Sequence, residues 1–120
     1  SEDETARLLS EGGDLEIEAD LYSPDGRVPV LAAGFVRADG AGLFTTSSEL
    51  DGARPVRVDA SHWRYRLRFT RLALLPASYI LRLHAMDPEG LRLFDTVERA
   101  VTIRGSTRFL GNFRMERQWG

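Results

Sequence analysis

Residues 79–86, YILRLHAM, constrain the fold most strongly, because their side chains alternate in character along the chain. The apolar set is Tyr79, Leu81, Leu83 and Ala85, and the mixed set is Ile80, Arg82, His84 and Met86. A period of two is that of a β-strand, so this stretch is expected to bury one face. Residues 87–90, DPEG, then form a turn, since Pro suits its second position and Gly tolerates a positive φ. The pattern predicts a hairpin that continues through residue 95.

Similar strand patterns recur along the rest of the chain. They cover residues 14–22, 28–39, 43–48, 63–72, 97–104 and 109–119, with a polar loop at 49–57 and a bulge or close backbone approach at Gly34. No stretch has convincing helical periodicity. The sequence therefore predicts one all-β domain over residues 1–120, an immunoglobulin-like antiparallel β-sandwich of about eight or nine strands. Residues 1–6 are acidic and are expected to fray, and residues 1–12 as a whole are partly disordered or the remnant of a first strand.

Tyr79 opens its strand directly after residues 74–78, LLPAS. A tyrosine in this place is similar to the tyrosine corner of Greek-key sandwiches, whose ring packs inward and whose hydroxyl bonds to backbone upstream. We therefore expect Tyr79 to determine the fold and to take no part in recognition.

Composition excludes several classes of function. The chain has no cysteine, so disulfides and thiolate metal sites are absent, and it has no lysine, so it contains no P-loop. The net charge of −2 does not favour nucleic acid. No apolar run approaches the ~20 residues that span a bilayer, so direct membrane insertion is not expected. Catalytic motifs such as G-x-S-x-G and H-E-x-x-H are also missing, and the chain is expected not to be an enzyme.

The three arginines Arg64, Arg66 and Arg68 lie on one face of their strand and allow two interpretations. They could bind an anionic ligand, or they could pair with the acidic face of residues 14–22. In an immunoglobulin-like order the two strands are neighbours, which places Glu16, Glu18 and Asp20 across from them. Cross-strand opposite charges stabilise a sheet. We favour the exposed charge ladder.

The remaining candidate ligands give weaker signals. His62, near Asp59, is interpreted as a surface histidine, and two histidines without cysteine do not favour a metal site. Calcium at Asp87, Glu89 and Asp95 is a second possibility, but D-P-E-G is first of all a turn. No cofactor is expected. A few aromatic residues are not firmly on the core phase and could offer a platform to a sugar ring, namely Tyr22, Phe44 and Trp119.

Several short motifs, in order, resemble one known family. They are GDLEI at 13–17, GFVRADG at 34–40, LFTTS at 43–47, LLPASYIL at 74–81, VERAVTIRG at 97–105 and FLGNFRM at 109–115, with Trp119 near the end. This set is similar to the C-terminal polysaccharide-binding domain of Wzt-type ATP-binding subunits of O-antigen ABC transporters. Two departures stand out: the family's Pro-Gly before the corner tyrosine is here Pro76-Ala77-Ser78, and the first strand is shortened.

The resemblance implies a function and a set of partners. It implies a non-catalytic sandwich that binds an exported cell-surface polysaccharide and is attached to a transporter ATPase with its membrane subunits, at the cytoplasmic face of the bacterial inner membrane. It also implies a homodimer in which residues 107–120 are exchanged between protomers. An apolar edge strand of that kind needs a partner. Because the chain begins at Ser1, we expect it to be a fragment of a longer protein.

The family's binding residues vary with the glycan, so the candidate site is taken from the non-core phase of the central sheet. The candidate residues are Arg37, Arg82, His84, Met86 and Arg104. Two other interpretations stay open. The chain could be a structural or adhesive immunoglobulin-like domain that binds protein, or an accessory domain of a glycan-processing enzyme.

Overall fold

The computed structural model describes residues 7–119, and the predicted fraying of residues 1–6 falls outside this range. The described residues form eight strands and no helix. The strands are β1 (Arg7–Ser10), β2 (Leu15–Tyr22), β3 (Val30–Arg37), β4 (Gly42–Ser47), β5 (Val56–Arg57), β6 (His62–Phe69), β7 (Ala77–Met86) and β8 (Leu93–Arg104).

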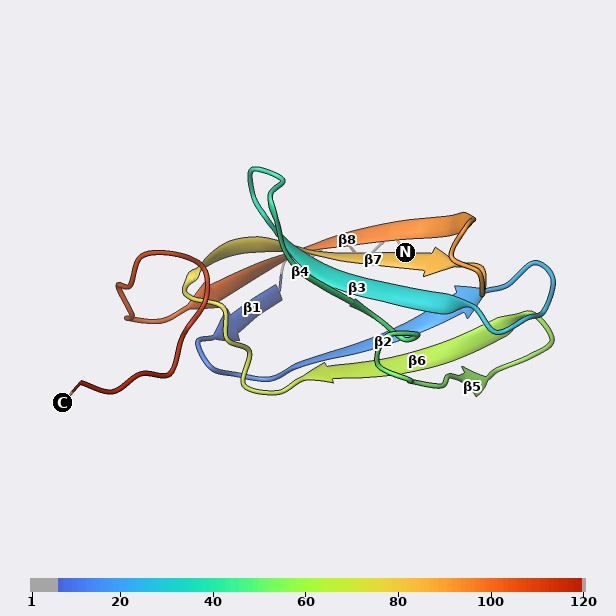
Figure 1. Cartoon of the computed structure of the whole chain (residues 1–120), viewed down its shortest axis with the longest axis horizontal. Coiled ribbons are helices and arrows are strands. Elements are labelled where there is room, and N and C mark those ends of the chain that lie inside the picture. Colours follow the sequence, from blue (N-terminus) through green and yellow to red (C-terminus); the bar gives the residue numbers. More distant parts are fainter. Residues whose placement is uncertain (1–6, 120) are drawn as a thin grey trace.

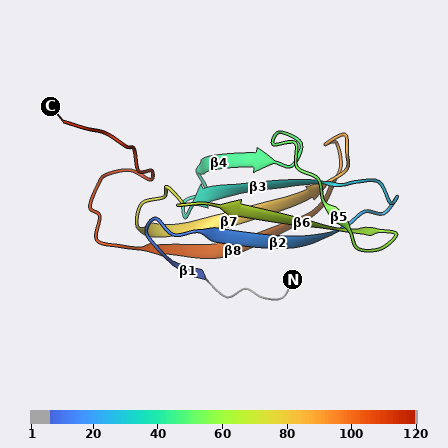
Figure 2. The same cartoon turned by 90° about the horizontal axis from the view of Figure 1, so that it is seen from below.

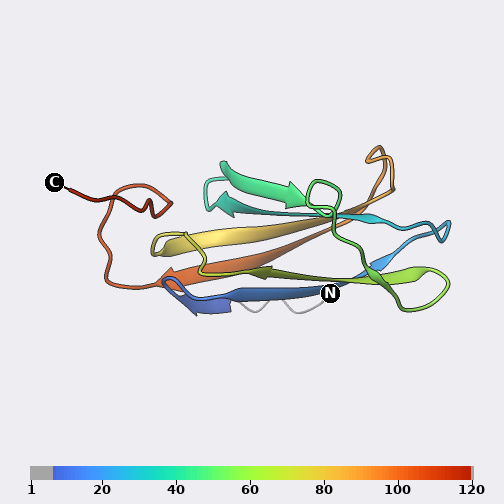
Figure 3. The same cartoon turned by 60° about the horizontal axis from the view of Figure 1, so that its bottom comes forward.

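The strands lie in two layers, a five-stranded sheet in the order β1-β8-β7-β3-β4 and a three-stranded sheet in the order β2-β6-β5. Figure 1 shows the larger sheet above the smaller one, and Figure 2 shows the same layers from below. The predicted all-β sandwich is confirmed. One pair departs from the expected antiparallel arrangement, because β1 runs parallel to β8. No hairpin joins these two strands, since β1 leads instead into β2 of the other sheet (Figure 3), so the direction of β1 is not fixed by a turn.

The core lies between the two sheets and uses the alternating residues that the sequence indicates. Its main cluster includes Leu15 of β2, Phe35 of β3 and Leu81 of β7, which are each at most 5% exposed. Phe35 also meets Phe69 of β6 edge to face, with ring centroids 5.2 Å apart. Apolar burial of this kind is the dominant stabilising term for such a domain.

The tyrosine corner is confirmed. Tyr79 is 2% exposed, and its hydroxyl donates a hydrogen bond of 2.6 Å to the carbonyl oxygen of Leu75. A second buried tyrosine, Tyr65 of β6, donates in the same way to the carbonyl oxygen of Pro29 over 2.6 Å, and burial raises its pKa. These two bonds fix loops at opposite ends of the sandwich.

The predicted hairpin and the close approach at Gly34 are confirmed too. Asp87 is buried, and one of its carboxylate oxygens accepts hydrogen bonds from the amides of Leu91 and Arg92, which closes the turn between β7 and β8. At Gly34 an added Cβ would lie 2.6 Å from Oγ1 of Thr45 and closer still to the carbonyl oxygen of Phe44. Only glycine allows β3 and β4 to approach so closely.

Three segment predictions need correction. Residues 97–104 do not form a separate strand, because β8 runs unbroken from Leu93 to Arg104 along β7. The loop at 49–57 contains the two-residue strand β5. Residues 109–119 form no strand in the single chain, and the pairing there is limited to a bridge between Phe113 and Leu74. The reason is positional, since this segment leaves the end of the sandwich (Figure 1), where no sheet edge runs beside it.

Candidate functional site

Three of the five candidate residues, Arg82, His84 and Met86, share one face of β7. They alternate with the core residues of the same strand, so they project from the five-stranded sheet on the side away from the other layer. Residues two apart on a strand are about 7 Å apart, which places the three side chains in a row. We call this side of the β8-β7-β3-β4 sheet the outer face.

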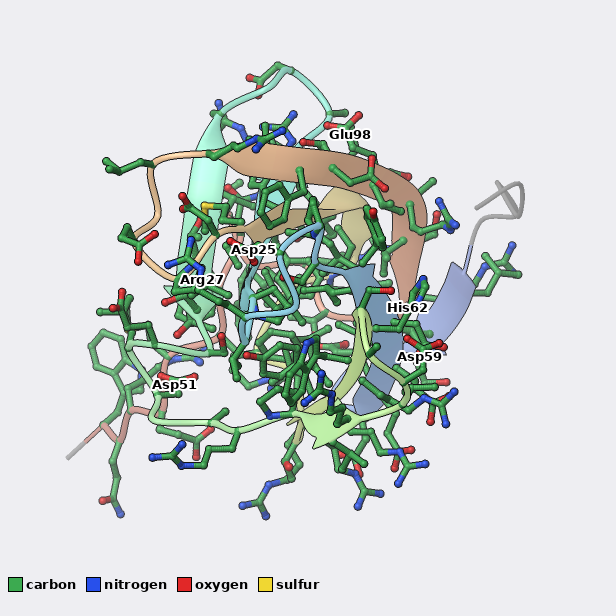
Figure 4. All side chains as sticks on the ribbon, turned by 90° about the vertical axis from the view of Figure 1, so that its right-hand side faces the viewer. Asp25, Arg27, Asp51, Asp59, His62 and Glu98 are labelled. Atoms are coloured by element: carbon green, nitrogen blue, oxygen red, sulfur yellow. The ribbon has the colours of Figure 1, made fainter. Side chains whose placement is uncertain are left out.

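Strand β8 supplies a partner to two of these residues. Nε of Arg82 donates a hydrogen bond to Oε2 of Glu98 over 2.6 Å, and both side chains are partly exposed. Nδ1 of His84 lies 2.9 Å from the hydroxyl oxygen of Thr96. Figure 4 views the sandwich from one end and shows Glu98 projecting outward from β8. The two cross-strand pairs therefore hold a guanidinium and an imidazole in place on the outer face.

Strands β3 and β4 complete the outer face with small and hydroxyl side chains. Gly34 lies across from Arg82, and Ala32 lies across from His84. On the far side of β3, Thr45 pairs with Gly34 and Ser47 pairs with Ala32. Gly34 and Ala32 are buried although none of the described strands covers this face. The small side chains of β3 thus form a shallow strip between the larger side chains of β7 and β4.

The other two candidate residues lie elsewhere. Arg104 shares the outward phase of β8, but it is six residues beyond Glu98, or about 20 Å along the strand. Arg37 lies across from Tyr79, on the phase of the core, at the exposed end of β3. Its Nη2 is 2.7 Å from Oδ2 of Asp39 in the turn before β4, which projects beyond the sheet in Figure 1. The hydrogen bond to Arg37 also lowers the pKa of Asp39.

The polar residues that neighbour Arg82 and His84 on the outer face were not among the sequence candidates; they are Thr45, Ser47, Thr96 and Glu98. Glu98 pairs with Arg82 and Thr96 pairs with His84, but counting back from the turn would not have found them, because the register shifts between Ala85 and Met86. Thr45 and Ser47 carry no local signal either, since their place depends on the register of β3 with β4.

Within residues 7–119, the acidic and histidine candidates are engaged with other partners and are not gathered around a metal site. Asp87 bonds to the backbone of its own turn, and Glu89 pairs with Arg27 over 2.7 Å. His62 lies 2.8 Å from Asp59 at the surface, and Figure 4 shows the two side by side. Among the residues that the structure describes, no three histidine or acidic side chains are arranged to hold a metal ion.

The arginine stripe forms the predicted charge ladder. Strand β2 pairs with β6 so that Glu16, Glu18 and Asp20 lie across from Arg68, Arg66 and Arg64. Nε of Arg64 donates to Oδ1 of Asp20 over 2.7 Å, and this hydrogen bond lowers the pKa of Asp20. Each arginine of the stripe contacts at least one of these carboxylates within 3.3 Å. Paired in this way, the arginines are a poor site for a separate anion.

An apolar groove lies at the end of the sandwich from which the C-terminal segment leaves. Phe44, Phe69, Leu72 and Phe113 are among the residues that line it. Phe44 is 47% exposed and meets Phe69 edge to face, with ring centroids 6.2 Å apart. The groove is separate from the outer face because Phe44 shares the core phase of Phe35.

Comparison with known proteins gives a clear result for the fold. No protein-family model matches the chain, and no curated protein matches it. Among solved structures, the chain is similar to a crystal structure of the C-terminal domain of Wzt, with a TM-score of 0.61 and 15% sequence identity. The similarity covers 93% of this chain and 72% of that chain. The resemblance seen in the sequence motifs is thus confirmed at the level of the fold.

No helix in residues 7–119 is long and apolar enough to cross a membrane.

Proposed function

We propose that this chain is a non-catalytic carbohydrate-binding module that recognises an O-antigen or a related cell-surface polysaccharide. The observation that carries the proposal is the fold shared with the C-terminal domain of Wzt over 93% of the chain. The ordered sequence motifs support it independently of the structure.

The outer face has the chemistry that such a ligand needs. Arg82 and Glu98 offer hydrogen-bond donors and acceptors to sugar hydroxyls, and His84 adds a planar group beside them. Met86, next in the row, adds an apolar surface. The face is open and shallow, so we expect weak binding of roughly −4 to −8 kcal/mol, which corresponds to millimolar to micromolar dissociation constants.

The wider context follows from the same resemblance. We infer that the module is attached to the ATPase subunit of an ABC transporter and selects the polysaccharide that the transporter exports. It would then work in the cytoplasm, at the inner face of the bacterial inner membrane. The parent protein would be a homodimer in which residues 107–120 pair with the partner.

Titration with the cell-surface polysaccharide of the source organism tests the binding function. We expect saturable chemical-shift changes in β7 and β8, and their loss in Arg82→Ala and His84→Ala variants. Arg64→Ala removes an arginine of matching exposure, 36% against 37% for Arg82, from the opposite face and serves as the matched control. No saturable response to intact or end-modified polysaccharide would reject the proposal.

A second candidate function is a structural or protein-binding immunoglobulin-like domain. It is favoured by the exposed apolar side chains of the C-terminal segment, of which Leu110 is 99% exposed and Trp119 is 91% exposed. Such side chains mark a contact surface for protein. Size-exclusion chromatography with and without residues 107–120 tests that contact. A dimer that survives the deletion would show that these exposed side chains are not the contact between two copies of the chain.

A further inference from the structure

The guanidinium near the centre of the outer face, that of Arg82, is paired with the carboxylate of Glu98 in the same chain. From this pairing we propose that the glycan bound there is uncharged. The inference rests on the proposed carbohydrate-binding function and narrows its ligand to neutral polysaccharides, as opposed to those that carry uronic acids, sialic acids or phosphate.

The central pair is Arg82 with Glu98. Nε of the guanidinium donates to Oε2 of the carboxylate at 2.6 Å, and the side chains are 37% and 47% exposed. An anionic sugar brought to Arg82 would therefore also meet the negative charge of Glu98, at nearly the same distance. The attraction and the repulsion largely cancel, because both act through the same solvent-exposed surroundings.

The same pair is well suited to neutral hydroxyl groups. The terminal nitrogens of Arg82 make no hydrogen bond with the described residues, so they are available as donors. The second carboxylate oxygen of Glu98 accepts no hydrogen bond from the described residues, so it is available as an acceptor. A sugar hydroxyl both donates and accepts, and it can use both groups at once. The dipolar pair thus favours hydroxyl groups over carboxylates.

The residues across from Arg82 on the neighbouring strands, Glu98 and Gly34, bring no second guanidinium to the pair. Beside Arg82 and His84, strands β3 and β4 contribute Ala32, Gly34, Thr45 and Ser47 to the outer face, and none of these carries a charge. His84 faces the hydroxyl of Thr96. Arg92 stacks over the ring of Phe94 at the start of β8, and within residues 7–119 no guanidinium lies directly across from Arg82. This arrangement differs from the arginine clusters that bind anions.

The two remaining arginine candidates, Arg37 and Arg104, add no positive charge near the pair of Arg82 and Glu98. Arg37 is bonded to Asp39 through two of its nitrogens, at 3.1 and 2.7 Å. Arg104 forms no ion pair within residues 7–119, but it lies about 20 Å from Glu98 along β8. That distance exceeds the ~10 Å over which an exposed charge acts at 0.1 M salt.

The experiment divides the cell-surface polysaccharide of the source organism by anion exchange into an unretained neutral fraction and a retained acidic fraction. Each fraction is titrated into the protein at about 20 mM and about 500 mM NaCl, the range over which surface charges become screened. We expect binding by the neutral fraction, with a dissociation constant that does not change with salt. Binding by the acidic fraction alone, weakened by salt, would overturn this inference and leave the carbohydrate-binding function standing. Binding by neither fraction would overturn both.

A charge variant tests the role of Glu98 directly. Glu98→Gln leaves Arg82 uncompensated, so the acidic fraction should gain affinity about two- to fivefold at low salt, which is the change that an exposed ion pair can supply. Glu16→Gln is the matched control, because Glu16 pairs with Arg68 on the opposite sheet. An acidic fraction that binds the two variants equally would overturn the assignment of Glu98 as the residue that excludes anions.

Discussion

The hydroxyl of Tyr79 lies 2.6 Å from the carbonyl oxygen of Leu75, four residues upstream, and both residues are 2% exposed. The bond fixes the loop before β7 to the strand that follows it. A Tyr79→Phe variant removes this hydrogen-bond donor. Because the carbonyl oxygen of Leu75 is buried, water cannot readily replace the lost hydroxyl. We expect a loss of about 1–3 kcal/mol in the free energy of unfolding, measured by urea denaturation. Tyr22→Phe, at a tyrosine that is 54% exposed, should leave stability unchanged.

A Gly34→Ala variant should destabilise the sheet for a different reason, which is steric. The added Cβ would lie 2.6 Å from Oγ1 of Thr45 and against the backbone carbonyl of Phe44. The hydroxyl can rotate away but the carbonyl cannot, so β3 and β4 must separate. Overpacking of this kind costs about 1–3 kcal/mol. Thermal unfolding provides the measurement, with Gly42→Ala in the same hairpin as the control, because a Cβ at Gly42 meets no atom within 4 Å. Equal stability of the two variants would contradict the steric explanation.

Strands with a clear alternation could be predicted from the sequence. The acidic β2 and the basic β6 each bury one face, so the sequence shows which of their side chains point inward. The opposite charges on their other faces then indicate that the two strands pair. The corner at Tyr79 was readable because a local bond needs only nearby residues. In both cases the sequence pattern and the final structure depend on the same short-range constraint.

Other features depend on contacts that no local pattern encodes. Strand β3 is buried on both faces from Leu31 to Val36, so its residues do not alternate, and Arg37 was consequently assigned to the wrong face. The partners of Arg82 and His84 come from the register of β7 with β8, which includes a shift between Ala85 and Met86. The C-terminal segment alternates like a strand, but a strand forms only beside a sheet edge.

The charge ladder should make a pH-dependent contribution to stability. The hydrogen bond from Arg64 holds the folded-state pKa of Asp20 below its ordinary value of 3.8. A lowered pKa stabilises the folded protein above that ordinary value, and the contribution is lost as pH falls through the folded-state pKa. Because the pair is exposed, the effect should be small and screened by salt. Asp20→Asn should therefore lower the urea midpoint at pH 7, and this difference should shrink as pH falls below 3.8. A difference that stays the same at low pH would count against the ion pair. Glu49→Gln, which removes a carboxylate that makes no ion pair within residues 7–119, is the control.

The base of the C-terminal segment is attached to the sandwich by Glu11 and Arg114. The two side chains form an ion pair, and that of Glu11 is only 11% exposed. Glu11 also packs over Gly105, where an added Cβ would lie 2.7 Å from Cβ of Glu11. Beside the ion pair, the amide of Arg114 donates to the carbonyl of Ala73 over 2.7 Å. The segment thus has a fixed base, while its apolar side chains farther along remain exposed.

Glu11→Gln should loosen this base without unfolding the domain. A hydrogen bond to a charged group is worth about 1.5–3 kcal/mol, so local opening should become at least about tenfold more frequent. Hydrogen exchange measures it at the amides of Leu75 and Arg114, which bond to Asn112 and Ala73, while amides of β7 should exchange as before. Glu116→Gln changes an exposed carboxylate of the same segment and should have no effect. Unchanged exchange at Arg114 in the Glu11→Gln variant would show that the backbone bonds alone hold the segment.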